Sequence, residues 1–256
     1  MIVEEETEKI NWLKTVDIPN LVCMVVTVIA FIAANYVPVK QLYVPENDSL
    51  SSFPYPGKEQ ISTIVCAVIV IVVGLVVIIG FFFLSLKFKR FFNQLNPFTA
   101  VYTFITVIAV TNVCVNIFKS YVGRPRPDLY ARCGIDGSID NCPGQTKKVA
   151  KDEFKSFPSG HSATAMSGLL FIALFVQKCV KTRKLWVTTL CFLFILLAFY
   201  IGATRIRVCR HHTDDDLAGF FVGFLFCYII WWRTYKEIFP KLKKRSEDIK
   251  DETATV

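Results

Sequence analysis

Six long runs without a charged residue constrain this chain more than any other feature. They cover residues 18–39, 60–86, 91–118, 162–177, 185–204 and 217–232. A helix that crosses a bilayer needs about 20 predominantly apolar residues. Two runs, 162–177 and 217–232, are slightly short of this length, and the other four meet it. Because 53% of the residues are hydrophobic, more than is usual in a soluble domain, we expect an all-α, multi-pass membrane protein with six transmembrane helices.

A large soluble core that hides these runs is the alternative, but it would need far more amphipathic covering than this sequence contains. The N-terminal residues MIVEEETEK are acidic, where a cleavable signal peptide is basic. We therefore expect the first helix to remain as an anchor. Residues 1–256 are expected to form a single integral membrane domain.

The short turns after the second and fourth runs indicate the orientation, because they are basic. Their basic residues, with those of the C-terminal end, are Lys87, Lys89, Arg90, Lys178, Lys181, Arg183, Lys184, Arg233, Lys236, Lys241, Lys243, Lys244 and Arg245. Short basic turns stay in the cytoplasm, so we expect the N-terminus (1–17) and a charged tail (233–256) to be cytoplasmic. The opposite, extracellular or lumenal face then holds residues 37–60, 119–161 and 205–216. The loop 119–161 is also basic, so the prediction depends on the short turns.

Two cysteines and one asparagine of the outer face bear on the compartment. Cys133 and Cys142 lie in the long outer loop with glycine and aspartate residues between them. On a lumenal or extracellular face such a pair forms a disulfide; two free thiols are the alternative, and the sequence favours neither. Asn47 begins the sequon Asn-Asp-Ser and is a glycosylation acceptor if this face is not cytoplasmic.

Three polar clusters stand at the outer ends of the expected helices. KSYVGRPRP spans 119–127 after the third run, FPSGHSAT spans 157–164 at the start of the fourth, and TRIRVCRHHTDDD spans 204–216 between the fifth and sixth. Helices three to six deliver these ends to one side of the membrane. We therefore expect the clusters to converge in an active site formed at the outer ends of helices three to six.

These clusters contain the groups that bind phosphate. Lys119, Arg126 and Arg205 supply fixed positive charge, and arginine fits phosphate oxygens through two parallel hydrogen bonds. Ser159 adds a hydroxyl, and Gly160 lets backbone N–H groups approach an anion closely at a helix N-terminus. The expected ligand is a phosphate group, held without a metal or another cofactor.

Two histidines and an aspartate complete a set for phosphoryl transfer. One histidine attacks phosphorus and the other protonates the departing oxygen, while a carboxylate holds the attacking imidazole in the correct tautomer. His211 and Asp215 are four residues apart, so they share a face on a helical turn. His161 lies in the second cluster and supplies the other imidazole.

The clusters resemble the three motifs of the type 2 phosphatidate phosphatase family, also called lipid phosphate phosphatases. The first motif is Lys, six residues, then Arg-Pro (119–127); the second is Pro-Ser-Gly-His (158–161); the third is Ser-Arg, five residues, His, three residues, Asp (204–215). One motif alone is a weak signal, but all three in order are a strong one, which covers roughly residues 100–232. Thr204 stands where the family has serine and keeps the hydroxyl.

The resemblance implies a role for each matched residue. His211 would be the nucleophile that forms a phosphohistidine, Asp215 would orient it, and His161 would be the general acid that later activates water. The substrate phosphate would be bound by Lys119, Arg126, Ser159, Gly160 and Arg205. The implied reaction is metal-independent hydrolysis of lipid phosphate monoesters or pyrophosphates of the phosphatidate, lysophosphatidate or diacylglycerol pyrophosphate type. The partners would be this lipid and the bilayer, with no nucleic acid.

Other functions stay open at this point. The chain is alternatively a phosphatase for a water-soluble sugar phosphate or a prenyl diphosphate on the same scaffold, or a membrane scaffold without activity. The segment HHTDDD also offers ligand types for zinc or manganese, although the nearby cations would repel a metal. We interpret Arg124, beside Arg126, as a surface charge. The sequence leaves open the oligomeric state, the membrane that holds the protein, and the roles of Arg207, His212, Asp214 and Asp216.

Overall fold

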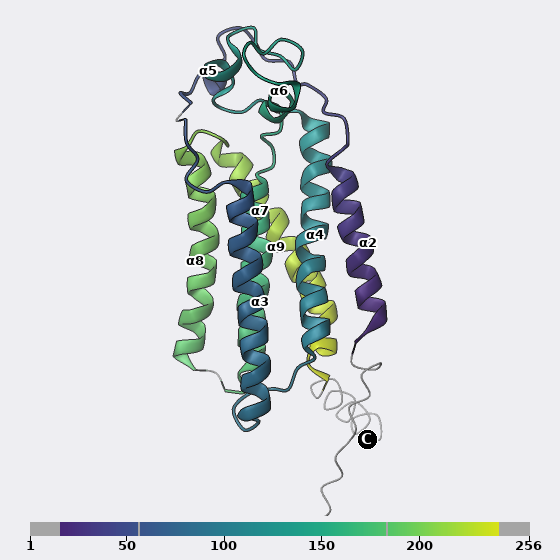
Figure 1. Ribbon diagram of the computed structural model, residues 1–256. Coiled ribbons are helices and arrows are strands. Elements are labelled where there is room, and N and C mark those ends of the chain that lie inside the picture. Colours follow the sequence, from purple (N-terminus) through teal and green to yellow (C-terminus); the bar gives the residue numbers. More distant parts are fainter. Residues whose placement is uncertain (1–15, 56, 183, 241–256) are drawn as a thin grey trace, which may run out of the picture.

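The computed structural model describes residues 16–55, 57–182 and 184–240, which form a bundle of long helices with a cap of loops at one end (Figure 1). The long helices are α2 (Ile18–Ala34), α3 (Thr63–Lys87), α4 (Pro97–Val122), α7 (Gly160–Cys179), α8 (Leu185–Arg207) and α9 (Thr213–Ile238). The cap contains the short helices α5 (Leu129–Cys133) and α6 (Lys147–Glu153) and the 3-10 turn η1 (Ser49–Ser51). The described residues form no strand, so the expected all-α class is confirmed.

Five of the helices, α3, α4, α7, α8 and α9, are long and apolar enough to cross a membrane. The chain is therefore a multi-pass membrane protein by the length and composition of its helices. The two uncharged runs that are slightly short, 162–177 and 217–232, lie in α7 and α9, which have 20 and 26 residues. Both helices are longer than the runs because they extend into the polar residues beside them.

α2 is instead the shortest of the long helices, with 17 residues. Its end is set by local sequence, since the side chain of Asn35 donates to the backbone oxygen of Phe31 and Pro38 follows. A proline disfavours the helical conformation in the residue before it. The first uncharged run therefore supplies less helix than its length suggests.

α9 extends into the segment expected to form the charged C-terminal tail (233–256). α9 continues through residues 233–238 and ends at Ile238, and Pro240 follows. A charged residue at position 233 does not end a helix, whereas a proline does. Residues 1–15 and 241–256, which make up most of the expected terminal segments, lie outside the described residues.

Capping residues set the ends of the helices that carry the three clusters. α4 starts after Asn96, whose side-chain oxygen accepts from the N–H of Phe98 at 3.0 Å. It ends at Val122, and the capping residue Gly123 that follows has a φ of 60°, a conformation that glycine adopts without strain. α7 starts after Ser159, whose Oγ accepts from the N–H of Ser162 at 3.5 Å. The chain therefore leaves α4 and enters α7 at the positions of the first two clusters.

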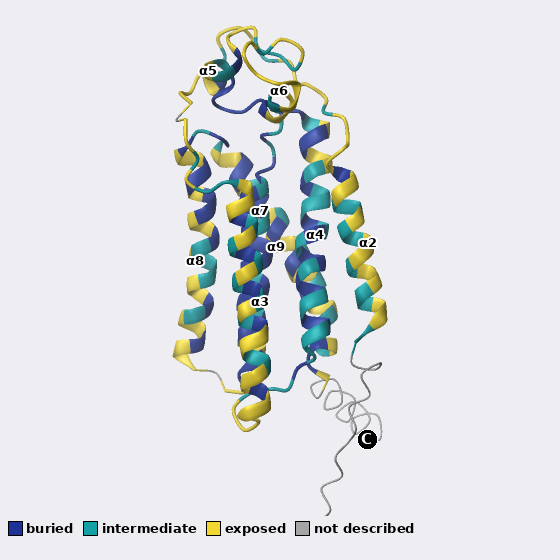
Figure 2. Ribbon diagram, in the orientation of Figure 1, coloured by how far each residue is buried: buried dark blue, intermediate teal, exposed yellow. Residues whose placement is uncertain are grey.

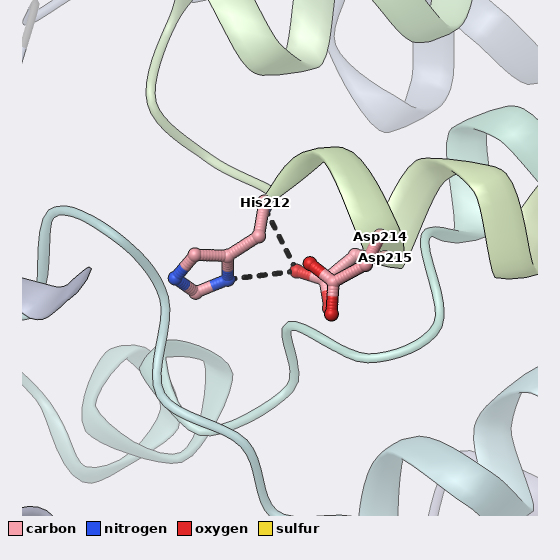
Figure 3. A group of neighbouring side chains, drawn as sticks. All are labelled: His212, Asp214 and Asp215. Carbon is pink, nitrogen blue, oxygen red and sulfur yellow. Dashed lines mark hydrogen bonds and ion pairs between the residues drawn. The ribbon is translucent and has the colours of Figure 1, made fainter.

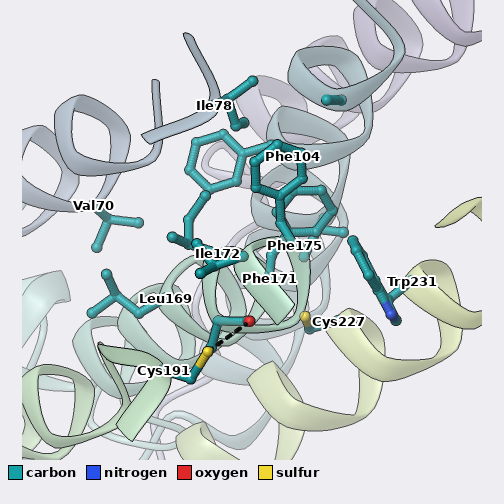
Figure 4. Packing of buried hydrophobic residues seen from close by; sticks show 14 of the residues in the cluster. Val70, Ile78, Phe104, Leu169, Phe171, Ile172, Phe175, Cys191, Cys227 and Trp231 are labelled. Atoms are coloured by element: carbon teal, nitrogen blue, oxygen red, sulfur yellow. Dashed lines mark hydrogen bonds between the residues drawn. The ribbon is translucent and has the colours of Figure 1, made fainter. Parts of the chain in front are cut away.

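α7 is the central helix of the bundle. It packs against α3, α4, α8 and α9, and most of its residues are buried (Figure 2). Aromatic rings fill the core around it, where Phe171 contacts Phe104, Phe175 and Trp231 (Figure 4). α2 packs against α4. Many apolar side chains of α3 and α8 are exposed, which suits helices that face lipid.

Two glycines let α9 approach α7 closely. Gly219 and Gly223 are four residues apart and share a face of α9. A Cβ atom at Gly219 would collide with the backbone oxygen of Ser159, and one at Gly223 with the backbone oxygen of Ala163. Small residues at this spacing are common where membrane helices touch. The glycines therefore set the distance between the polar ends of α7 and α9.

The cap covers the end of the bundle where α4 and α8 finish and α7 and α9 begin (Figure 1). Within it Cys133 and Cys142 are joined as a disulfide, and Leu129 and Phe154 are fully buried in the same small cluster. Asn47 is exposed on the cap. The turns that follow α3 and α7 lie at the opposite end of the bundle (Figure 1). The segments expected on the outer face therefore lie together.

We expect Gly223→Ala to destabilise the protein, because the added methyl group must push α9 away from the backbone of α7. Overpacking of this kind costs about 1–3 kcal/mol. The matched control is Gly80→Ala in α3, where an added Cβ meets nothing within 4 Å. Thermal unfolding in detergent should show a lower Tm for Gly223→Ala alone, and equal Tm values in the two variants would contradict the packing.

Candidate active site

Four helices bring the expected site residues to the capped end of the bundle. Lys119 lies in the last turn of α4, His161 in the first turn of α7, Arg205 in the last turn of α8 and Asp215 in the first turn of α9. His211 lies in the turn between α8 and α9. Residues that are far apart in the sequence therefore meet in one region.

A cavity of about 450 Å³ opens among these residues. Its lining includes six of the eight site residues expected from the sequence: Lys119, Arg126, Gly160, His161, Arg205 and His211. Ser159 and Asp215 are fully buried and do not line it. The three clusters therefore surround a common space, with two of their members held inside the protein.

His211 is buried, with only 3% of its surface exposed. Its Nε2 lies 3.4 Å from Nη1 of Arg126. Its Nδ1 lies 3.8 Å from Oδ2 of Asp215 and has no hydrogen-bond partner among the described residues. Burial lowers the pKa of His211 well below its usual value; Asp215 opposes this shift, and the charges of Lys119 and Arg126 add to it. The imidazole is therefore neutral near pH 7, as a nucleophile must be.

The hydrogen bonds of Asp215 go to residues other than His211, the partner expected from the sequence. Its Oδ2 accepts from the backbone N–H of His212 at 2.9 Å and from Oγ of Ser156 at 2.5 Å, and Nδ1 of His212 lies 3.1 Å away (Figure 3). Its Oδ1 accepts from Nη1 of Arg124 at 2.7 Å. The contact with His211, at 3.8 Å, is longer than a hydrogen bond.

Arg124 is not a free surface charge, which corrects its interpretation from the sequence. Its Nη1 contacts the carboxylates of both Asp214 and Asp215, and only 21% of its side chain is exposed. The sequence feature that could have indicated this contact is the run of three aspartates at the start of α9, because adjacent carboxylates need a positive charge nearby. His212 also links α9 to the cap, since its Nε2 lies 3.1 Å from the backbone oxygen of Leu50.

His212, Asp214 and Asp215 form a group of metal-ligand types (Figure 3). The guanidinium of Arg124 contacts both carboxylates of this group, so a cation already neutralises them. A metal ion between these carboxylates would be repelled by the guanidinium. The geometry therefore does not fit the zinc or manganese site that the segment HHTDDD left open.

Lys119 and Arg126 are buried cations that the cap holds in place. Nζ of Lys119 donates to the backbone oxygen of Lys155. Arg126 donates through Nη1 to the backbone oxygen of Arg210 at 2.9 Å and through Nη2 to Oδ2 of Asp152 at 3.0 Å. These bonds leave each cation at the cavity wall with donors to spare.

Four buried nitrogen atoms of residues that line the cavity have no hydrogen-bond partner among the described residues: Nδ1 of His211, Nε of Arg210, Nε of Arg205 and Nε2 of His161. The first two lie 3.8 Å and 3.4 Å from carboxylate oxygens of Asp215 and Glu59. Nη1 of Arg205 donates to the backbone oxygen of Ile61 at 2.8 Å and to Glu59 at 3.3 Å, so its Nε edge stays available. Buried polar atoms are rarely left unpaired, and this edge of a guanidinium suits phosphate oxygens. The arrangement fits an anionic oxygen ligand.

The sequence did not reveal a second set of ionised residues at this end of the bundle. Glu59, Asp152 and Arg210 line the cavity, while Asp128 and Glu153 are fully buried. Burial alone would raise the pKa of Asp152, but the charges of Arg126 and Arg210 hold it below its usual range. Asp152 and Glu153 lie in α6 and the other three come from separate loops, so no motif spacing or periodicity indicates the set.

Three further residues of the third cluster, Thr204, Arg207 and Asp216, do not line the cavity. The hydroxyl of Thr204 donates to the backbone oxygen of Ile201 at 2.6 Å. Oδ1 of Asp216 accepts from Oγ of Ser162 at 2.5 Å, which ties α9 to α7. Arg207 is exposed. Asp216 is therefore the residue of these three whose side chain connects two helices.

Residues 100–239 of the chain match the model of the PAP2 superfamily. A probable diacylglycerol pyrophosphate phosphatase 1 of Schizosaccharomyces pombe is 29% identical over 79% of this chain and 74% of its own length. Phospholipid phosphatase 2 of Mus musculus is 30% identical over 80% of this chain and 81% of its own. Probable lipid phosphate phosphatase 4 of Arabidopsis thaliana is 36% identical over 44% of this chain and 41% of its own. No solved structure matches the chain.

The buried, neutral His211 should make stability depend on pH. Its pKa is lower in the folded state than in the unfolded chain, where it is about 6.5. Its contribution to stability is therefore complete above about pH 6.5 and is lost as the pH falls toward the folded-state pKa. Tm measured from pH 7.5 to pH 5 should fall more steeply for the wild type than for His211→Asn. Parallel curves would show that His211 is not buried in its neutral form.

Proposed function

Because the chain belongs to the PAP2 superfamily and its relatives are phosphatases, we propose that it is a membrane phosphatase acting on lipid phosphates. Its substrates are phosphate monoesters or pyrophosphates of the phosphatidate, lysophosphatidate or diacylglycerol pyrophosphate type. The observation that carries this proposal is the cavity, whose wall combines the cations with many apolar side chains, among which lie a few amides and hydroxyls such as Asn112 and Thr164.

The apolar part of the cavity wall comes from three helices. α2 contributes Val28 and Phe31, α3 contributes Ile71, and α4 contributes Ile105 and Ile108. A lipid phosphate has an anionic head and apolar chains, and these match the two parts of the wall. A water-soluble sugar phosphate has nothing to place against the apolar part. The lining therefore supports a lipid over a sugar phosphate, and it also accommodates a prenyl diphosphate.

In the proposed reaction, Nε2 of His211 attacks phosphorus, and a P–N bond forms while the bond from phosphorus to the leaving oxygen breaks. The leaving oxygen takes the electron pair and a proton from His161. Water then gives a proton to His161 and attacks phosphorus, the P–N bond breaks, and inorganic phosphate leaves. Asp215 holds the proton on Nδ1 of His211. Their present separation of 3.8 Å shortens on substrate binding, as catalytic hydrogen bonds commonly do.

The chain's own cations supply the charge that the transferred phosphoryl group requires. Lys119, Arg126 and Arg205 bind its oxygens, and Ser159 and Gly160 at the start of α7 place the N-terminal end of that helix toward it. We therefore propose that the reaction needs no metal ion. The partners are the lipid substrate and the bilayer.

The membrane arrangement is part of the same proposal. α2 is the sixth span: it is apolar and packs along α4, and thinning of the bilayer or tilt of its neighbours accommodates its shorter length. Residues 1–256 form one domain with both termini in the cytoplasm. The cap, with its disulfide and exposed Asn47, faces the lumenal or extracellular side together with the active site.

We expect purified protein in mixed micelles to release phosphate from phosphatidate, lysophosphatidate and diacylglycerol pyrophosphate in the presence of EDTA. His211→Ala should fall below about one thousandth of the wild-type rate, because the nucleophile is lost. His212→Ala is the matched control: it removes a hydrogen bond to Asp215 and leaves the nucleophile, so activity should remain measurable. Full inactivation by EDTA that zinc or manganese restores would contradict the metal-independent reaction, and a higher kcat/KM for glucose 6-phosphate would contradict the lipid substrate.

Single cysteines should report the sidedness. A cysteine at Lys147, on the cap, should react with an impermeant thiol reagent added from the extracellular or lumenal side. One at Lys181, at the opposite end of the bundle, should react only after the membrane is permeabilised. The reverse pattern would place the active site in the cytosol.

A further inference from the structure

Arg210 lies immediately before His211, and carboxylates surround its guanidinium. It is 3% exposed. Its Nη1 lies within 3.1 Å of carboxylate oxygens of Asp128 and Glu153, which are both fully buried. Burial opposes a charge at this place, but Glu153 and Asp128 raise the pKa of Arg210 above its usual value. The guanidinium is therefore charged and anchored in the cap.

Other atoms of the same guanidinium meet two carboxylates that also contact the expected phosphate-binding arginines. Oδ2 of Asp152 lies 3.2 Å from Nη2 of Arg210 and 3.0 Å from Nη2 of Arg126. Glu59 lies 3.4 Å from Nε of Arg210 through Oε1 and 3.3 Å from Nη1 of Arg205 through Oε2. Arg126 and Arg205 are thus each one shared carboxylate away from Arg210.

The backbone of Arg210 adds two more links. Its carbonyl oxygen accepts from Nη1 of Arg126 at 2.9 Å, and the same Nη1 lies 3.4 Å from Nε2 of His211. Its N–H donates to the backbone oxygen of Arg205 at 3.1 Å. One residue therefore connects the turn that carries His211 with both arginines.

We propose that Arg210 is a positioning residue that fixes the guanidinium groups of Arg126 and Arg205 for phosphate binding, acting through Asp152 and Glu59. This inference rests on the proposed phosphatase function and adds to it a residue that acts on phosphate binding through the carboxylates of Asp152 and Glu59. Without Arg210, the two bridging carboxylates would pair only with Arg126 and Arg205 and would compete with phosphate for them.

The geometry requires an arginine at this position. A guanidinium presents five donors in one plane, whereas a lysine ammonium is a compact charge on a flexible stem. Arg210→Lys therefore keeps a cation beside the buried Asp128 and Glu153, which protects folding, but it cannot also reach the carboxylates of Asp152 and Glu59. This variant therefore keeps the contact of residue 210 with Asp128 and Glu153 and removes its contacts with Asp152 and Glu59, the carboxylates shared with Arg126 and Arg205.

The test compares Arg210→Lys with Arg132→Lys. Arg132 contacts the same buried Glu153, at 2.7 Å, and does not contact Asp152 or Glu59. Binding of orthovanadate, a phosphate mimic, is measured by calorimetry on the purified protein in detergent. Loss of the hydrogen bond to Asp152 and of the ion pair with Glu59 should weaken the Kd of Arg210→Lys by about tenfold. Arg132→Lys should stay within about twofold of the wild type because it is not coupled to the site. An unchanged Kd in Arg210→Lys, or equal losses in both variants, would overturn the inference.

A merely structural role for Arg210 predicts a different result. It would lower the Tm of both lysine variants and leave the vanadate Kd of the folded protein unchanged. The double variant Arg210→Lys, Asp152→Asn gives a second readout. If Arg210 acts through Asp152, the effects of the two substitutions on the vanadate Kd are not additive. Strict additivity would overturn the inference even if each single variant binds vanadate weakly.

Failure of the proposed function is a separate outcome. A wild-type protein that binds vanadate but releases no phosphate from any lipid phosphate would contradict the phosphatase reaction, and the comparison of the two lysine variants would still decide the role of Arg210. A wild-type protein that does not bind vanadate would contradict both proposals.

Discussion

The close packing of α7 on α9 is the contact on which the candidate site depends. His161 lies in the first turn of α7 and Asp215 in the first turn of α9. The N–H of Ser159 donates to the backbone oxygen of Asp215 at 2.9 Å, and Gly219 leaves the space that this bond requires. Two helices that start together place a histidine of one and a carboxylate of the other at the same depth. The cavity forms where α4 and α8 end beside them.

The charges at this end of the bundle are tolerated because they are paired. Asp128 and Glu153 are fully buried beside Arg210, and Asp152 and Glu59 each contact two arginines. A buried charge left without its partner costs about 3–5 kcal/mol. The loops of the cap therefore do more than cover the bundle, since they bring the carboxylates that allow several arginines to remain inside.

Local regularities made the helices, and the residues that meet at the cavity, predictable from the sequence. Uncharged runs indicate membrane helices, and motif spacing selected residues such as Lys119 and His211 that the fold brings to one cavity. The end of α2 and the hydrogen-bond partners of Asp215 could not be predicted in this way. They depend on contacts between loops, such as that of Arg124 with α9, and contacts of this kind leave no periodic pattern in the sequence.

The central position of α7 has a consequence for how the chain enters its membrane. Among the five helices that are long enough to span the membrane, α7 is the least hydrophobic and α3 the most hydrophobic. It carries polar residues such as Ser162, Thr164 and Ser167, so by itself it partitions into lipid less favourably than α3. α3 and α4 precede α7 in the chain and pack against it. During synthesis they are already available when α7 leaves the ribosome, and its entry into the bilayer is coupled to the formation of its first tertiary contacts.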